Sequence, residues 1–228
     1  MKPIDLSIQN CYSQTGIEGF PVVMWKYGTG KHKQTAYQIR LFQNGAEIYT
    51  TDKVLSNEQN YIPLPYELEE QTEYVYQVRV WDGDGQDYES DKATFISGVK
   101  AWKGCWIGKR TTKPFIAKKT FVLESIEKSV ISVCVPGQFE VRLNGEKIST
   151  NVYEGCQTDF HKHVHYQTYD MTPFLIIGEN KLTIEVANGW YIGDDDRGKR
   201  YFYTMDKGYE AFGMCLALLA QLRNAMSL

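Results

Sequence analysis

The stretch Glu179-Asn180-Lys181-Leu182-Thr183-Ile184-Glu185-Val186-Ala187-Asn188-Gly189-Trp190-Tyr191 decides how this chain of 228 residues folds. Its apolar residues Leu182, Ile184 and Val186 alternate with polar ones. Strict alternation predicts a β-strand with one buried face and one face in water. The turn-forming residues at the start of the stretch predict a tight entry into that strand.

The end of this strand is a candidate binding surface. Glycine in Asn188-Gly189 allows the backbone to bend, and two large aromatic residues, Trp190 and Tyr191, follow. A flat apolar ring beside an amide group suits a sugar. The alternative is that Trp190 belongs to the core, because apolar residues in patterned segments usually do.

The same alternation recurs along the chain. Residues 36–42 and 72–81 both read as strands, and Tyr74 near the start of the second has the placement of a tyrosine corner. Asn44-Gly45 and Asn144-Gly145 are hairpin signals, because both positions of a type I′ turn need positive φ. No long helical period occurs, so the sequence predicts an all-β chain.

The strands fall into two groups, joined near Gly98. We predict two tandem β-sandwiches: an immunoglobulin or fibronectin type III-like domain over residues 1–98 and a jelly-roll, carbohydrate-binding-like domain over 99–228. In the second, Asp170 is expected to support a short helical turn, with Thr172 as N-cap and Pro173 at the first helical position. Residues 214–222 are apolar and read as a strand or a short helix.

Composition narrows the class of protein. The net charge of −3 gives no field to attract nucleic acid or an anionic membrane, so neither is an expected partner. The five cysteines are scattered without a CxxC pair, which argues against a zinc site and a disulfide framework. The N-terminus lacks the apolar core of a signal peptide, and no apolar run reaches transmembrane length. We therefore expect a cytoplasmic protein, or an extracellular one if a signal peptide has been removed.

The second half of the chain resembles the N-terminal β-sandwich module of bacterial α-L-rhamnosidases. The matching pieces are Trp106-Ile107, 139–145, 166–172, Gly178-Glu179-Asn180, Asn188-Gly189-Trp190-Tyr191 and 217–222. The first half is similar to the fibronectin type III-like domain that precedes this module, through residues 34–39, 74–82 and 93–95. Each motif alone is weak, but their order is fairly specific.

The resemblance implies the non-catalytic N-terminal part of a larger glycoside hydrolase. In that family a later (α/α)₆ barrel hydrolyses the rhamnosyl bond, and this chain has no helical repeats of that kind. We expect no catalysis by this chain alone and no catalytic residues in it, and we expect the second module to be truncated after residue 222. The second domain would bind or orient rhamnose-containing glycans. The alternative is a scaffold that packs on the catalytic domain of the parent chain and binds no sugar.

Some relatives of the second module bind L-rhamnose through calcium, so the resemblance implies a site to test. The expected sugar contacts are Asn188, Trp190, Tyr191 and Asn151. Calcium takes six to eight oxygen ligands, for which Asn151, Asp159 and Asp194 are the candidates. Family members often carry an acidic residue near the position of Thr150, and its absence here argues against calcium.

Two further groups are weaker candidates. His161, His163 and His165 alternate, so on a strand their imidazoles would share one face and could hold a metal ion. The alternative is a polar edge strand at the surface. Among the carboxylates, Glu140 and Glu185 are expected on polar strand faces and not in a catalytic pair.

Overall fold

The computed structural model describes residues 2–9, 14–28, 33–108, 114–152, 154–160, 162–189 and 217–224, and of the last segment only the side chain of Ala220. These residues form β-strands and one short 3₁₀ turn, with no α-helix among them, so the predicted all-β class is confirmed. The chain divides into two compact units, Met1–Lys100 and Ala101–Leu228. Among the described residues no helix is long and apolar enough to cross a membrane.

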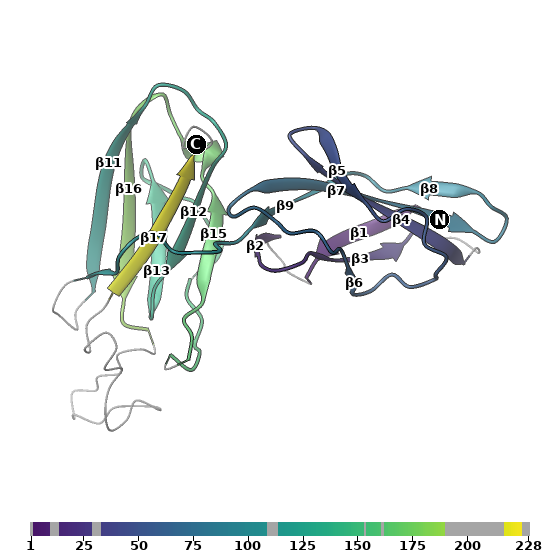
Figure 1. Cartoon of the computed structure of the whole chain (residues 1–228). Coiled ribbons are helices and arrows are strands. Elements are labelled where there is room, and N and C mark those ends of the chain that lie inside the picture. The colour runs from purple at the N-terminus through teal and green to yellow at the C-terminus, as the bar shows by residue number, and fades with distance from the viewer. Residues whose placement is uncertain are drawn as a thin grey trace. The chain divides into compact units, whose positions relative to one another are not determined.

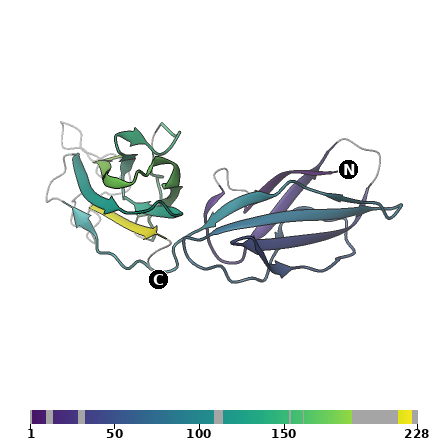
Figure 2. The same ribbon diagram turned by 90° about the horizontal axis from the view of Figure 1, so that it is seen from above.

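The first unit is a sandwich of two sheets (Figure 1). Its strands are β1 (Pro3–Ile8), β2 (Thr15–Ile17), β3 (Val22–Tyr27), β4 (Gln34–Gln43), β5 (Ala46–Thr50), β6 (Ile62–Pro63), β7 (Glu73–Asp82), β8 (Asp87–Glu89) and β9 (Ala93–Ser97). One sheet has the order β1-β3-β6, and the other has the order β2-β9-β7-β4-β5, with β8 also paired to β7. Figure 2 shows the long strands running in roughly the same direction, as in an aligned sandwich.

The core of the first unit forms between the alternating faces of both sheets. On β7, Tyr74, Tyr76, Val78 and Val80 are fully buried, as the alternation predicted. They pack in one cluster with residues of β1, β3 and β4. The indole nitrogen of buried Trp25 donates a hydrogen bond to Gln34 Oε1 at 3.2 Å, so its polar group is satisfied inside the sandwich.

Tyr74 is a tyrosine corner, which confirms the prediction. Its hydroxyl oxygen accepts a hydrogen bond of 2.8 Å from the backbone amide of Glu69, five residues upstream. The ring itself is buried and stacks on Phe95, with centroids 5.3 Å apart. The contact fixes the loop before β7 against the core.

The second unit is also built from two sheets. Its elements are β10 (Ile107–Gly108), β11 (Phe115–Leu123), β12 (Ser129–Cys134), β13 (Gln138–Leu143), β14 (Glu146–Lys147), β15 (Tyr166–Asp170), the 3₁₀ turn η1 (Thr172–Phe174), β16 (Gly178–Ala187) and β17 (Ala217–Asn224). The sheet orders are β10-β17-β12-β15 and β11-β16-β13-β14. β17, in yellow in Figure 1, pairs with β12, so the described part of the apolar segment predicted as a strand or a helix, residues 217–222, is a strand.

The alternating strand β16 is an inner strand of its sheet. It pairs with β11 on one side and β13 on the other. Ile184 and Val186 are buried in the core cluster, and Leu182 packs against that cluster. Because side chains alternate along a strand, the residue between the two buried ones, Glu185, lies on the outer face.

Both hairpin turns form as predicted. Asn44 and Gly45 have φ of 50° and 82° between β4 and β5, and Asn144 and Gly145 have φ of 54° and 88° between β13 and β14. Asn144 also donates from Nδ2 to Asn180 Oδ1 at 2.9 Å. The second turn is therefore tied to the start of β16.

The predicted N-cap of the helical turn is wrong by one residue. The cap position is Met171, and Thr172 is already the first residue of η1. The Thr172 hydroxyl oxygen instead accepts a hydrogen bond of 3.0 Å from the Ser129 amide at the start of β12. Asp170 does support the turn: its Oδ1 accepts from the Thr172 amide at 3.0 Å, and its Oδ2 pairs with Lys128 Nζ at 2.9 Å.

Replacing Tyr74 by Phe should destabilise the first unit by about 1–2 kcal/mol, because the ring stays but a buried hydrogen bond is lost. The measurement is urea denaturation of the whole chain. The matched control is Tyr61→Phe, since Tyr61 is an exposed tyrosine of the same unit. Equal midpoints for the two variants would show that the corner contributes nothing.

The second unit should lose stability in acid through Asp170. Burial alone would raise the pKa of this carboxyl, but hydrogen bonds from Thr172 and Lys128 hold it below its usual value. Because its pKa is lower in the folded state than in the unfolded state, the Asp170 carboxylate stabilises the folded protein above pH about 4, the unfolded-state pKa. This contribution is lost as the pH falls through the folded-state pKa. Asp170→Asn should therefore cost stability at pH 7, and the cost should shrink below about pH 4. Glu146→Gln, which removes an exposed carboxylate of the same unit, should show no such convergence.

Candidate functional site

Asn188 directly follows β16 and is half-buried. Its side-chain oxygen Oδ1 is buried and has no hydrogen-bond partner among the described residues. A buried acceptor without a donor costs about 1–3 kcal/mol. Any donor to this oxygen must therefore come from outside the described residues.

Three glycines allow the backbone segments beside the end of β16 to approach closely. A Cβ on Gly137 would lie 2.5 Å from the carbonyl oxygen of Ala187. Gly189 has φ of +50°, and a Cβ there would lie 2.9 Å from the amide nitrogen of Gln138. A Cβ on Gly155, whose φ is +98°, would collide with the carbonyl oxygen of Gly137. The end of β16 is thus held by contacts that no larger residue permits.

Asn151, the second predicted sugar contact, is exposed but its amide group is engaged. Nδ2 donates to both carboxylate oxygens of Glu154, at 3.2 and 3.3 Å. The hydroxyl of Ser149 donates to the same carboxylate. In this structure the Asn151 amide therefore orders its own loop.

Glu154 is a buried carboxylate that sequence reasoning missed. Its backbone carbonyl accepts from the Phe139 amide at 3.1 Å, which attaches this loop to β13. Burial raises the pKa of the Tyr169 phenol, and the adjacent Glu154 charge raises it further. The spacing of Ser149, Asn151 and Glu154 was the available signal, because short polar side chains at such spacing form local hydrogen bonds.

The predicted calcium ligands do not form a recognisable metal centre in the part of the chain that the structure describes. Asp159 forms an ion pair with Lys162 at 3.3 Å, and its carbonyl accepts from two following amides. No group of three or more His, Cys, Asp or Glu side chains could hold a metal among the described residues.

The rings of His163 and His165 stack with centroids 5.4 Å apart. They precede β15 and do not belong to a strand.

Several predicted positions lie outside the described residues. These are Trp190, Tyr191, Asp194 and His161. Of the three predicted sugar contacts at the end of β16, the structure therefore describes only Asn188. The exposure of the Trp190 ring, which would separate a core role from a binding role, stays a prediction.

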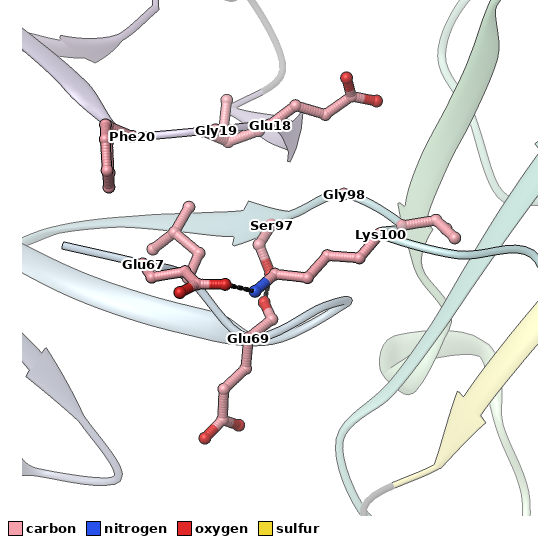
Figure 3. A pocket seen from close by; sticks show the side chains of 11 residues that line it. Glu18, Gly19, Phe20, Glu67, Glu69, Ser97, Gly98 and Lys100 are labelled. Carbon is pink, nitrogen blue, oxygen red and sulfur yellow. Dashed lines mark hydrogen bonds and ion pairs between the residues drawn. The ribbon is translucent and has the colours of Figure 1, made fainter. Parts of the chain in front are cut away.

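The first unit contains a hollow of about 410 Å³ near its C-terminal end. Figure 3 shows Phe20 on one side of it and the ion pair between Lys100 and Glu67, 2.7 Å long, on the other. The Ser97 hydroxyl is hydrogen-bonded to the carbonyl of Glu69. Because these polar groups already pair with each other, the hollow offers a sugar few free partners.

A second hollow, of about 450 Å³, lies in the second unit on the β11-β16-β13 sheet, at the end where Asn188 leaves β16. We call it the sheet hollow. Its lining residues are Pro114, Phe115, Ile116, Gln138, Phe139, Glu140, Val152, Glu185, Val186 and Ala187. Val152 and Ala187 directly follow and precede the predicted contacts Asn151 and Asn188, so the hollow adjoins both.

The carboxylate of Glu140 gives the sheet hollow a fixed charge. It pairs with Arg142 at 2.5 Å and with Lys147 at 3.0 Å. The Lys147 hydrogen bond, supported by Arg142, lowers the pKa of Glu140 against the opposing effect of desolvation. Glu140 is therefore ionised at neutral pH and compensated by two cations.

Comparisons with known proteins agree on one family. Residues 124–226 match the model described as the α-L-rhamnosidase N-terminal domain, and residues 3–100 match the Rha78A-like N-terminal immunoglobulin domain. The chain is 27% identical to an α-L-rhamnosidase of Formosa agariphila and 28% identical to one of Alteromonas sp.. These alignments cover 76% and 77% of this chain but 22% of each relative, so the chain spans about a fifth of their length.

Solved structures show the same fold. The α-L-rhamnosidase of Aspergillus terreus matches with a TM-score of 0.77 and 24% identity, over 99% of this chain and 27% of that one. The α-L-rhamnosidase of Dictyoglumus thermophilum matches with a TM-score of 0.76 and 27% identity, over 97% of this chain and 27% of that one. This chain corresponds to about a quarter of each of these rhamnosidase chains.

Replacing Glu154 by Ala should destabilise the second unit by about 1–3 kcal/mol, because the hydrogen bonds that Ser149 and Asn151 donate to its buried carboxylate are lost. Thermal and urea denaturation of the whole chain measure the loss. Glu146→Ala is the matched control, because Glu146 is an exposed glutamate of the same unit. If Glu154→Ala is no less stable than this control, the loop does not depend on its buried carboxylate.

Proposed function

Since this chain belongs to the α-L-rhamnosidase family and carries its N-terminal region, we propose that its second unit binds or orients rhamnose-containing glycans for an α-L-rhamnosidase-like glycoside hydrolase. The observation that carries the proposal is the buried side-chain oxygen of Asn188, which has no donor among the described residues. It adjoins the sheet hollow, whose volume of about 450 Å³ is adequate for a small ligand.

The residues proposed to contact the glycan are Asn188 and, from the segment outside the described residues, Trp190 and Tyr191. Asn151 contributes indirectly in this proposal, because its amide group holds Glu154 and thereby the loop that carries Val152. The proposal includes no catalytic residue in this chain. The chemistry belongs to the catalytic domain of the parent protein.

A scaffold role for the second unit is the alternative, and a separate observation favours it. Val122, Ile176 and Ile177 are exposed at the end of the β11-β16 sheet that lies opposite the sheet hollow. Exposed apolar residues that cluster in this way are typical of protein contact surfaces. In this alternative they pack on the catalytic domain of the parent chain, and the unit binds no sugar.

Titration of the purified chain with L-rhamnose, followed by calorimetry and Trp fluorescence, separates the two roles. We expect saturable binding, and about tenfold weaker binding in Asn188→Ala, because a donor to a buried acceptor is worth about 1.4 kcal/mol. The control is Asn57→Ala, which removes an exposed amide from the first unit. Each titration is run with calcium and with a chelator.

The outcomes are distinct. Loss of binding in the chelator would restore a calcium role for Asp159 or Asp194, while binding in both conditions would assign recognition to the protein groups alone. Absence of heat and of any spectral change up to millimolar sugar would contradict glycan binding and leave the scaffold role.

A further inference from the structure

The sheet hollow holds two carboxylates that face each other. Glu140 on β13 and Glu185 on β16 are direct partners in the antiparallel register. Like charges in such a pair destabilise a sheet. Glu140 is compensated by Arg142 and Lys147, but Glu185 is exposed and makes no hydrogen bond or ion pair with the described residues. Among the described residues, the Glu185 carboxylate is therefore available as a hydrogen-bond acceptor.

Besides the two carboxylates and the half-buried amide of Gln138, the lining offers exposed aliphatic side chains. Ile116 lies across from Glu185 in the register of β11 and β16, and its side chain is 52% exposed. Val152 contributes a second exposed aliphatic group, at 76%. The two aromatic residues of the lining, Phe115 and Phe139, belong to the core, so they do not offer a flat ring to a ligand.

These groups define the chemistry of the ligand. A carboxylate accepts hydrogen bonds from hydroxyl groups, and an aliphatic wall favours a small apolar group close to them. Among the described lining residues no aromatic ring is exposed, so the contacts that these residues offer are the carboxylate and the aliphatic wall. A 6-deoxyhexose meets both requirements, because it carries a methyl group on a ring that otherwise bears hydroxyls.

We propose that the sheet hollow recognises the methyl group of a terminal 6-deoxyhexose, with Ile116 and Val152 covering the methyl group and Glu185 accepting hydrogen bonds from ring hydroxyls. This inference rests on the proposed function and assigns the residues that determine its specificity. Glu140 is a positioning group, because it fixes Lys147 and Arg142 beside the hollow. Asn188 marks the edge of the same site.

The test compares two sugars that differ at one position. The methyl α-glycosides of L-rhamnose and L-mannose differ only in that a methyl group in the first is a hydroxymethyl group in the second. Calorimetry of the whole chain should show binding of the rhamnoside that is at least about fivefold tighter than that of the mannoside, in the range that one apolar group supplies.

Variants of the lining identify the site. Ile116→Thr and Val152→Thr keep a β-branched side chain but introduce a hydroxyl, and each should reduce the preference for rhamnoside to about twofold or less. Glu185→Gln should weaken the binding of both glycosides by a similar factor, about tenfold. It removes the charge of the group that accepts from the sugar hydroxyls, and it leaves the aliphatic wall of Ile116 and Val152 unchanged. Val122→Thr makes the same change on β11 at a residue that is 69% exposed and outside the lining, and should match the parent.

The failures can be told apart. In one outcome the rhamnoside binds, and its affinity falls in Asn188→Ala but in no variant of the lining. The glycan-binding function then stands, and the sheet hollow is not its site. Equal affinity for the two glycosides would overturn recognition of the methyl group. If neither glycoside binds the folded parent chain, the proposed function itself fails, and this inference fails with it.

Discussion

The two-residue period of β16 is the constraint on which the second unit depends. Ile184 and Val186 must be buried to form the core between the sheets, and pairing on both sides fixes the strand in register. Because alternate side chains point to opposite faces, burying these two residues necessarily places Glu185 on the outer face, opposite Glu140. The core and the sheet hollow are therefore consequences of a single register, and a shift by one residue would destroy both.

Close backbone packing imposes a second constraint, at the end of the same strand. Gly137, Gly155 and Gly189 occupy positions where a side chain would collide with neighbouring backbone atoms. Their packing sets the place at which Asn188 leaves the sheet, and it holds the loop of Glu154 against β13. Beside these glycines, the buried amide oxygen of Asn188 has no donor among the described residues.

Features encoded within a few residues were predictable from the sequence. Alternation gave the long strands, and the two Asn-Gly pairs gave their turns, because each depends only on local φ and on side-chain period. Features that join distant residues were not. The Ser129 amide, far away in sequence, donates a hydrogen bond to the hydroxyl oxygen of Thr172, and the cap position is Met171. The facing pair of Glu140 and Glu185 likewise exists only once two strands are in register.

The two roles considered for the second unit use different residues of one sheet. In the register of β11 and β16, Ile116 faces Glu185 near one end, whereas Val122 faces Glu179 near the other. A contact surface at the Val122 end would therefore leave the sheet hollow open. Packing at the Val122 end is therefore compatible in space with a ligand in the sheet hollow, and the two roles are separated by whether the unit binds sugar and not by competition for one surface.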